Sequence, residues 1–237
     1  MRLPSTLAVY PFDRRRGGRD ISRSTNPSAR MLGVKYGQGP DGRRDGSAVF
    51  FGRRTSYVEI PNTGRLDARY SITILIWVYH DGNRPGPVVN FNPNGFGVHL
   101  WMKGRRQLFV RFMHRNGRRT RPLRSNRFKY QAWNYVGATY DERSGVAMLW
   151  VNSNPVATRR LGRVRLSTNY PIRLGAIRRS RGYFRGKLFC LQLYSVPLTK
   201  KQIFEAKRKC FLPGEFARFY IQCNQAKSEV KCTKGHN

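Results

Sequence analysis

The chain has 237 residues, with 46 lysines and arginines against 12 aspartates and glutamates, and a formal net charge of +34. A hydrophobic content of 39% and an aromatic content of 13% indicate a packed core and exclude a disordered polycation. An excess of this size destabilises the folded state by self-repulsion, and 35 of the basic residues are arginines, whose planar fork binds sulfate, phosphate and carboxylate. We therefore expect a surface that faces a polyanion.

Short apolar and β-branched runs, separated by turn residues, follow one another along the chain at the spacing typical of a sandwich or a barrel. We expect strands at residues 6–12, 31–36, 47–52, 56–61, 71–79, 86–91, 96–102, 107–113, 133–140, 146–152, 154–166, 170–175 and 183–195. Residues 71–79, "SITILIWVY", are apolar at nearly every position, which favours a central strand buried on both faces. The pattern predicts an all-β fold.

One helix is predicted near the end of the chain, in "LTKKQIFEAKRKC". Thr199 and Gln202 have the spacing of a capping box, and Ile203, Ala206 and Cys210 then share one helix face. This face should pack back on the sandwich. Further on, Phe216, Phe219, Tyr220 and Cys223 also have helical spacing, which suggests a second helix.

Four cysteines lie late in the chain: Cys190, Cys210, Cys223 and Cys232. Their spacing includes no C-x₂-C pair, so we expect disulfides in an oxidising, extracellular setting rather than a zinc site. Four cysteines allow three connectivities. We favour Cys190–Cys210, which joins the last strand to the helix, together with Cys223–Cys232.

The start of the chain and the length of its apolar runs bear on localisation. No apolar run approaches the roughly 20 residues that span a bilayer. The opening "MRLPSTLAVYPF" is too short and broken for the apolar region of a signal peptide. Either a signal peptide has been removed, the start of the gene is truncated, or the chain is cytosolic. The cysteines favour the extracellular alternative, which is the predicted localisation, with no signal peptide visible in this chain.

Three segments follow one another in the chain: "SYVEIPNTGRLDARYSITILIWVY", "WNYVGATYDERSGVAMLWVNSNPV" and "FRGKLFCLQLYSVPLTKKQI". In this order they resemble the laminin-G-like and pentraxin-like group of the concanavalin A-like lectins and glucanases, and the opening "YPFDRRRGGRDIS" is similar to the start of that family. The matching positions are Tyr57, Ile60, Leu66, Ile74, Trp77, Trp133, Ala138, Tyr140, Gly145, Leu149, Val151, Asn152, Phe184, Gly186, Leu188, Leu193, Tyr194, Leu198 and Ile203. These are core and turn positions, so they are informative about fold more than function.

The resemblance implies a two-sheet antiparallel jelly-roll sandwich over residues 1–210, followed by a cysteine-containing tail at residues 211–237. One departure is Ser153-Asn154, where the family has Gly; we expect Asn154 to take the left-handed conformation instead. A second is the scarcity of carboxylates for the family's calcium sites. Asp20 is either a ligand or a residue that orders its loop, and we expect no metal and no cofactor.

Catalysis is not expected. Glycoside hydrolases of this fold need two carboxyl groups on either side of the scissile bond, commonly presented at i and i+4 on one strand, and no E-x-D-x-x-E run occurs. There is no G-x-S-x-G motif for a hydrolase nucleophile. The four histidines, His80, His99, His114 and His236, lack metal-ligand spacing.

The hairpin "VRFMHRNGRRTRPLR" carries the largest group of arginines around an Asn116-Gly117 turn. Strand alternation predicts that Arg111 and Arg115 project on the same outer face. The predicted ligand-binding residues are Arg105, Arg106, Arg111, Arg115, Arg118, Arg119, Arg121 and Arg124, with a second group at Arg178, Arg179, Arg181 and Arg185. A third basic group is Arg159, Arg160, Arg163 and Arg165. Phe109, Trp150 and Tyr183 are either core residues or stacking platforms for a sugar.

These observations predict a non-catalytic extracellular module that binds acidic, sulfated glycans. The first alternative is a structural or interaction protein of an extracellular matrix that binds acidic partners. The second is non-specific binding of nucleic acid or a membrane surface, which fits the charge but has no motif beyond it.

Overall fold

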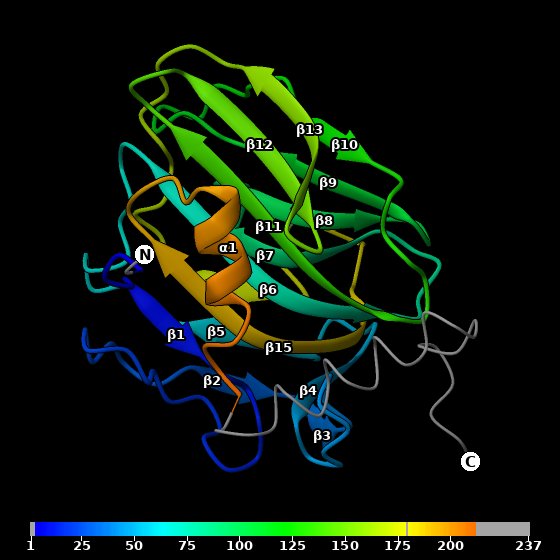
Figure 1. The fold of residues 1–237 in the computed structure, drawn as a ribbon. Helices are drawn as coiled ribbons and strands as arrows, with labels where there is room; N and C mark the ends of the chain where they lie inside the picture. The colour runs from blue at the N-terminus through cyan, green and yellow to red at the C-terminus, as the bar shows by residue number, and fades with distance from the viewer. Residues whose placement is uncertain (1–2, 179, 212–237) are drawn as a thin grey trace, which may run out of the picture.

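The computed structural model describes residues 3–178 and 180–211, and within them two antiparallel sheets stack face to face (Figure 1). The eight-stranded sheet has the order β13-β12-β11-β6-β15-β4-β3, with β1 paired to β15. The seven-stranded sheet has the order β10-β9-β8-β7-β14-β5-β2. This confirms the predicted two-sheet sandwich.

Most strands lie within or next to the expected segments, but the segment expected at residues 31–36 is divided between β2 and β3, which lie in different sheets, and β10 was not expected. The eight-stranded sheet consists of β1 (Ala8–Tyr10), β3 (Lys35–Gly37), β4 (Ser47–Phe51), β6 (Ile72–His80), β11 (Trp133–Asp141), β12 (Val146–Val151), β13 (Asn154–Arg160) and β15 (Arg185–Tyr194). The seven-stranded sheet consists of β2 (Arg30–Leu32), β5 (Tyr57–Ile60), β7 (Gly86–Phe91), β8 (His99–Lys103), β9 (Gln107–Arg111), β10 (Leu123–Ser125) and β14 (Ile172–Leu174).

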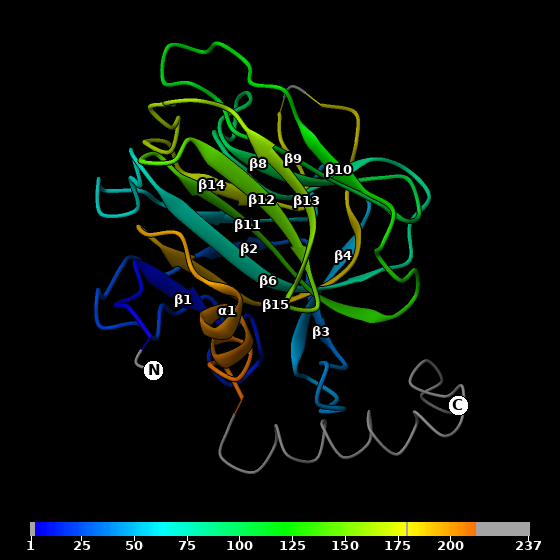
Figure 2. The same ribbon diagram turned by 45° about the horizontal axis from the view of Figure 1, so that its top comes forward.

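Strand β6 is buried on both faces, as predicted, because each face has a cover of its own. Ile74 and Ile76 point into the core between the sheets, while Leu75 and Trp77 belong to a second apolar cluster on the outer face. Helix α1 (Lys200–Ala206) provides that outer cover and lies across the strands beside β15 and β6 (Figure 2).

The capping box of α1 is present. The Thr199 hydroxyl accepts from the Gln202 amide, and the Gln202 side chain accepts from the Thr199 amide at 2.9 Å. Ile203 and Ala206 are fully buried on the face toward the sheet. A short helix of this kind is stable because one apolar face packs on a sheet, rather than through intrinsic propensity.

The disulfide Cys190–Cys210 is formed and confirms the predicted pairing. The register of β15 shifts between Phe189 and Gln192, and Phe189 and Cys190 both lie in the outer cluster beneath α1. In a regular strand, Cys190 would point to the opposite face from Phe189, into the core between the sheets. The bulge turns it toward the helix instead. Cys223, Cys232 and the second expected helix lie outside the described residues.

The hairpin between β12 and β13 corrects one prediction. Its left-handed residues are Asn152, with φ 51°, and Ser153, with φ 65°, and not Asn154. Asn154 instead begins β13 and pairs with Val151. Positive φ at both central residues is the geometry of a two-residue turn that matches the strand twist, so the turn lies one position earlier than expected.

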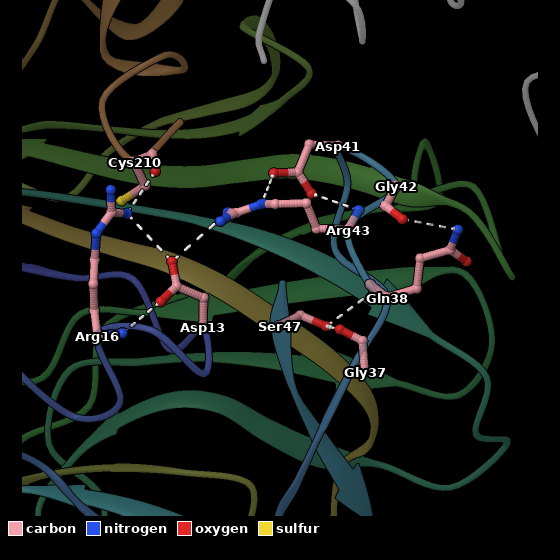
Figure 3. Close-up of polar contacts among 9 residues, drawn as sticks. All are labelled: Asp13, Arg16, Gly37, Gln38, Asp41, Gly42, Arg43, Ser47 and Cys210. Atoms are coloured by element: carbon pink, nitrogen blue, oxygen red, sulfur yellow. Dashed lines mark hydrogen bonds and ion pairs between the residues drawn. The ribbon is translucent and has the colours of Figure 1, made fainter. Parts of the chain in front are cut away.

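A group of buried ion pairs fastens the end of the described chain to two loops near its start (Figure 3). Arg16 Nη1 lies 3.3 Å from Asp13 and donates to the Cys210 carbonyl at 2.8 Å. Arg43 lies 3.7 Å from Asp13 and donates to Asp41 at 2.6 Å. Both carboxylate side chains are 1% exposed. We refer to Asp13, Arg16, Asp41, Arg43 and the Cys210 carbonyl as the N-terminal clamp.

Candidate functional site

The arginine-rich hairpin is a strand pair with a long loop. β9 ends at Arg111, and beyond it the two arms are joined by an isolated bridge between Met113 and Arg119. Backbone hydrogen bonds from His114 to the Arg118 carbonyl and from Thr120 to the Phe112 carbonyl also connect them. The Asn116-Gly117 turn is present, with φ 85° at Gly117. Alternation continues past Arg111 to Phe112, which lies in the core, but it does not fix the direction of Arg115 and the arginines after it.

Arg115 does not share the outer face with Arg111, contrary to the prediction. Its guanidinium makes two hydrogen bonds to the Asp67 carboxylate, at 3.1 and 2.6 Å, and Thr168 donates to the same carboxylate. Burial raises the pKa of Asp67, but the bonds from Arg115 and Thr168 outweigh it and the pKa is lowered. Arg115 thus joins three segments of the fold and is already neutralised.

The remaining predicted arginines are dispersed. Arg105 lies over the Tyr130 ring at 5.7 Å, Arg118 approaches His114 at 3.4 Å, and Arg185 lies 3.4 Å from Asp81. Arg106, Arg121 and Arg181 are exposed, as are Arg159, Arg160 and Arg163 in the third group. Arg165 of that group covers the Tyr70 ring at 4.4 Å. Arg179 lies outside the described residues.

Arg111, Arg119 and Arg124 converge on one pocket of about 280 Å³ on the outer face of the seven-stranded sheet. We call this the outer-face pocket. Leu100, Met102, Leu108 and Val110 fill the core, so the alternate residues of β8 and β9 face outward. The lining consists of Phe96, His99, Trp101, Lys103, Phe109, Arg111, Met113, Arg119, Arg124 and Ser180. It contains four cations and no carboxylate.

Aromatic rings form the floor of the outer-face pocket, and cations surround them. Phe109 stacks on His99 with ring centroids 5.7 Å apart. Lys103, Arg111 and Arg124 lie over the Phe109 ring at 5.4, 5.2 and 5.5 Å. Trp101 and Phe109 are 4% and 5% exposed, so neither presents an open ring face. Phe96 is 39% exposed, and its ring centroid lies 5.9 Å from that of Trp101, so Phe96 is the ring available to a ligand.

Two buried donors of this pocket have no hydrogen-bond acceptor among the described residues: Trp101 Nε1 and Arg111 Nε. Such groups cost free energy unless an acceptor from a ligand or from water completes them. Burial and the positive charges of Arg119 and Arg124 lower the pKa of Arg111, which means that its cation is held without compensation. The arrangement favours an anion.

His99 contributes shape rather than charge. Burial lowers its pKa to about 4, against a hydrogen bond to the Gly97 carbonyl, and the neighbouring cations Arg111 and Lys103 lower it further. At neutral pH the ring is therefore neutral, and the positive charge of the pocket comes from Lys103 and the three arginines.

Sequence reasoning missed six of the lining residues: Phe96, His99, Trp101, Lys103, Met113 and Ser180. A usable signal existed for three of them, because His99, Trp101 and Lys103 alternate with the core residues Leu100 and Met102. Of the three aromatic residues considered, Phe109 lines the pocket. Trp150 packs in the outer cluster of the other sheet and donates to Thr139 at 3.0 Å.

Asp20, considered above as a calcium ligand, and Asp141 each order their own loop. Asp20 accepts hydrogen bonds from the amides of Val9, Ser22 and Asn26 and from two side chains. Asp141 accepts from Arg143 and Ser144 within its hairpin turn. Within residues 3–178 and 180–211, no three His, Cys, Asp or Glu side chains converge as a metal site, and no helix is long and apolar enough to cross a membrane.

The family model described as the concanavalin A-like lectin/glucanases superfamily matches residues 51–204. No curated protein matches the chain in sequence.

Solved structures resemble the fold. The binding domain of Paraclostridial Mosquitocidal Protein 1 is 14% identical, with a TM-score of 0.67 over 86% of this chain and 52% of that one. The ligand-binding domain of botulinum neurotoxin serotype D, in complex with N-acetylneuraminic acid, is 11% identical, with a TM-score of 0.69 over 86% of this chain and 51% of that one. The serotype G binding domain is 14% identical, with a TM-score of 0.64 over 92% and 51%. The chain thus spans about half the length of these domains, and the likeness is one of fold.

Proposed function

The chain belongs to the concanavalin A-like lectin/glucanase superfamily, and from this we propose that it is a non-catalytic extracellular module that binds an acidic glycan in the outer-face pocket. The observation that carries the proposal is the composition of the pocket: four cations, two unsatisfied donors, one exposed ring and no carboxylate. An acidic sugar offers the matching groups, since its sulfate or carboxylate pairs with arginine and its hydroxyls accept hydrogen bonds.

Three further points support the proposal. The serotype D domain of similar fold was crystallised with N-acetylneuraminic acid, an acidic sugar, although this chain spans only half of that domain and no site is carried over. The Cys190–Cys210 disulfide fits an oxidising compartment. A pocket without a carboxylate lacks the acid and the base that glycoside hydrolysis needs, so incubation with acidic oligosaccharides should release no new reducing ends.

The test is binding to heparin as a function of salt. Four neutralised cations predict a log–log slope of roughly −3 to −4, by analogy with single-stranded and duplex nucleic acid. The variant Arg111→Gln/Arg119→Gln/Arg124→Gln should lose about 2 to 3 units of that slope while remaining folded. Uncharged dextran should not compete, and lysine in place of these arginines should bind less tightly because the fork is lost.

The matched control is Arg159→Gln/Arg160→Gln/Arg163→Gln, exposed arginines on and next to β13 of the other sheet. Both variants lower the net charge from +34 by three, to +31. The control should keep nearly the whole slope. Equal losses in both variants would contradict a pocket and would favour the alternative function, a matrix interaction protein whose dispersed exposed arginines bind acidic partners as a diffuse field.

A further inference from the structure

A second basic pocket, of about 410 Å³, lies on the same sheet. Tyr57 of β5 and Arg173 of β14 belong to its lining, and both alternate with core residues such as Val58 and Ile172, so they face outward. Arg54 and Arg178 complete its positive lining, and both are exposed. The outer face of the seven-stranded sheet therefore carries two separate basic pockets.

The charges of the second pocket are also only partly compensated. Arg173 is 6% exposed, stacks over the Tyr57 ring at 3.8 Å and lies 2.8 Å from Glu59. Its Nε is buried and has no hydrogen-bond acceptor among the described residues. Neither Arg54 nor Arg178 has a carboxylate within ion-pair distance in the part of the chain that the structure describes. Among the described residues, Arg173 is thus the only one of the three arginines that is paired with a carboxylate.

Ile177 lies next to both pockets. Ile177, 1% exposed, packs with Trp101 and Phe109 beneath the outer-face pocket and also lines the second pocket. Its segment is held on the sheet by hydrogen bonds from Gly175 to the Pro87 carbonyl and from Arg178 to the Pro93 carbonyl. Ile177 is therefore held in place on the surface of the sheet.

The order of the strands gives the distance that a ligand must cover to reach both pockets. The outer-face pocket rests on β8 and β9, and the second pocket on β14 and β5. Four strand-to-strand steps separate β9 from β5, which at about 4.8 Å each amounts to about 19 Å. Resting on the function proposed above, we propose that the two pockets are anion subsites for one acidic glycan chain, which runs across the strands and over Ile177.

This arrangement makes affinity depend on ligand length. A fragment too short for the span occupies one pocket, whereas a fragment that reaches both converts the second contact into an intramolecular one. Size-defined heparin fragments, from disaccharide upward, measured by titration calorimetry at one salt concentration on the full chain, should show a rise of at least about tenfold at the first fragment that spans both pockets. This rise exceeds the gradual increase expected from more binding registers.

The variant Arg54→Gln/Arg178→Gln should lose the step, so that the long fragments gain less than about tenfold in affinity over the disaccharide. The control Arg159→Gln/Arg160→Gln, with the same change in charge on β13, should keep the step. A smooth dependence on length in the wild type, or an equal loss of the step in both variants, would overturn the two-subsite inference. If the disaccharide binds and the Arg111/Arg119/Arg124 variant does not weaken it, the proposed function itself fails instead.

Discussion

Arginine has opposite surroundings in the N-terminal clamp and in the outer-face pocket. In the clamp, Arg16 and Arg43 lie against two buried carboxylates and a backbone carbonyl (Figure 3). In the pocket, Arg111, Arg119 and Arg124 lie among aromatic rings with no carboxylate in the lining. The first set is paired within the fold, whereas the second set has no carboxylate in the lining of its pocket and is the proposed site for an anion. The number of arginines therefore does not distinguish the two regions. They differ in whether the fold itself supplies a carboxylate partner.

The largest effect should come from breaking the clamp. Asp13→Asn removes the charge that Arg16 and Arg43 share while keeping the shape of the side chain. Because a buried ion pair that loses one partner leaves the other charge uncompensated, we expect the free energy of unfolding to fall by about 3 kcal/mol. Urea denaturation measures this, and the heparin salt slope should not change. A variant of unchanged stability would mean that the clamp contributes no stability.

The next effect concerns the floor of the outer-face pocket. The pKa of His99 is about 4 in the folded protein against 6.5 for the free group, so the unfolded chain takes up its proton first as the pH falls. The contribution of the neutral His99 ring to the free energy of unfolding is complete above pH 6.5. It is lost between pH 6.5 and about 4, and amounts to on the order of 3 kcal/mol.

The His99→Gln variant should lack this loss. Urea denaturation of both proteins from pH 7 to pH 4 provides the measurement, and the difference between their curves removes the carboxylates common to both. Parallel curves would show that His99 is not held neutral by the pocket.

A smaller and sharper comparison lies within one hairpin. Arg115→Gln should lower the free energy of unfolding by about 1–2 kcal/mol, because its pair with Asp67 is half-buried, and should leave the heparin slope unchanged. Arg119→Gln should instead reduce the heparin salt slope by roughly 0.7–0.9. It should change the free energy of unfolding by no more than about 0.5 kcal/mol. If the two variants behave alike, the division between paired and unpaired arginines is wrong.

The smallest effect should come from Arg14→Gln. Its pair with Asp45 spans 3.5 Å and the arginine side chain is 71% exposed, so water and salt screen the attraction. Denaturation should show a change below about 0.5 kcal/mol, and heparin elution should be unaltered. A loss comparable with that of Asp13→Asn would place Arg14 in the clamp after all.

The features that could be predicted from the sequence are those that depend on local patterns. The apolar run of β6, the capping box at Thr199 and the Cys190–Cys210 pair depend on neighbours in sequence or on one short closure. The direction of Arg115 depends on Asp67, 48 residues away, and could not be read from alternation. The outer-face pocket requires β8, β9 and β10 to lie side by side and the segment after β14 to return over them, which no single stretch reveals.

The disulfide also decides how the protein would carry tension. A pull on the chain beyond residue 210 reaches Cys210 and crosses the covalent bridge to Cys190, in the middle of β15. β15 is hydrogen-bonded to β6, β4 and β1, so the load spreads into the centre of the larger sheet. Helix α1 lies within the bridged loop and bears none of it. The Arg16 contact to the Cys210 carbonyl shares the load with the N-terminal loop, and the sandwich can be tethered from this end without unwinding its helix.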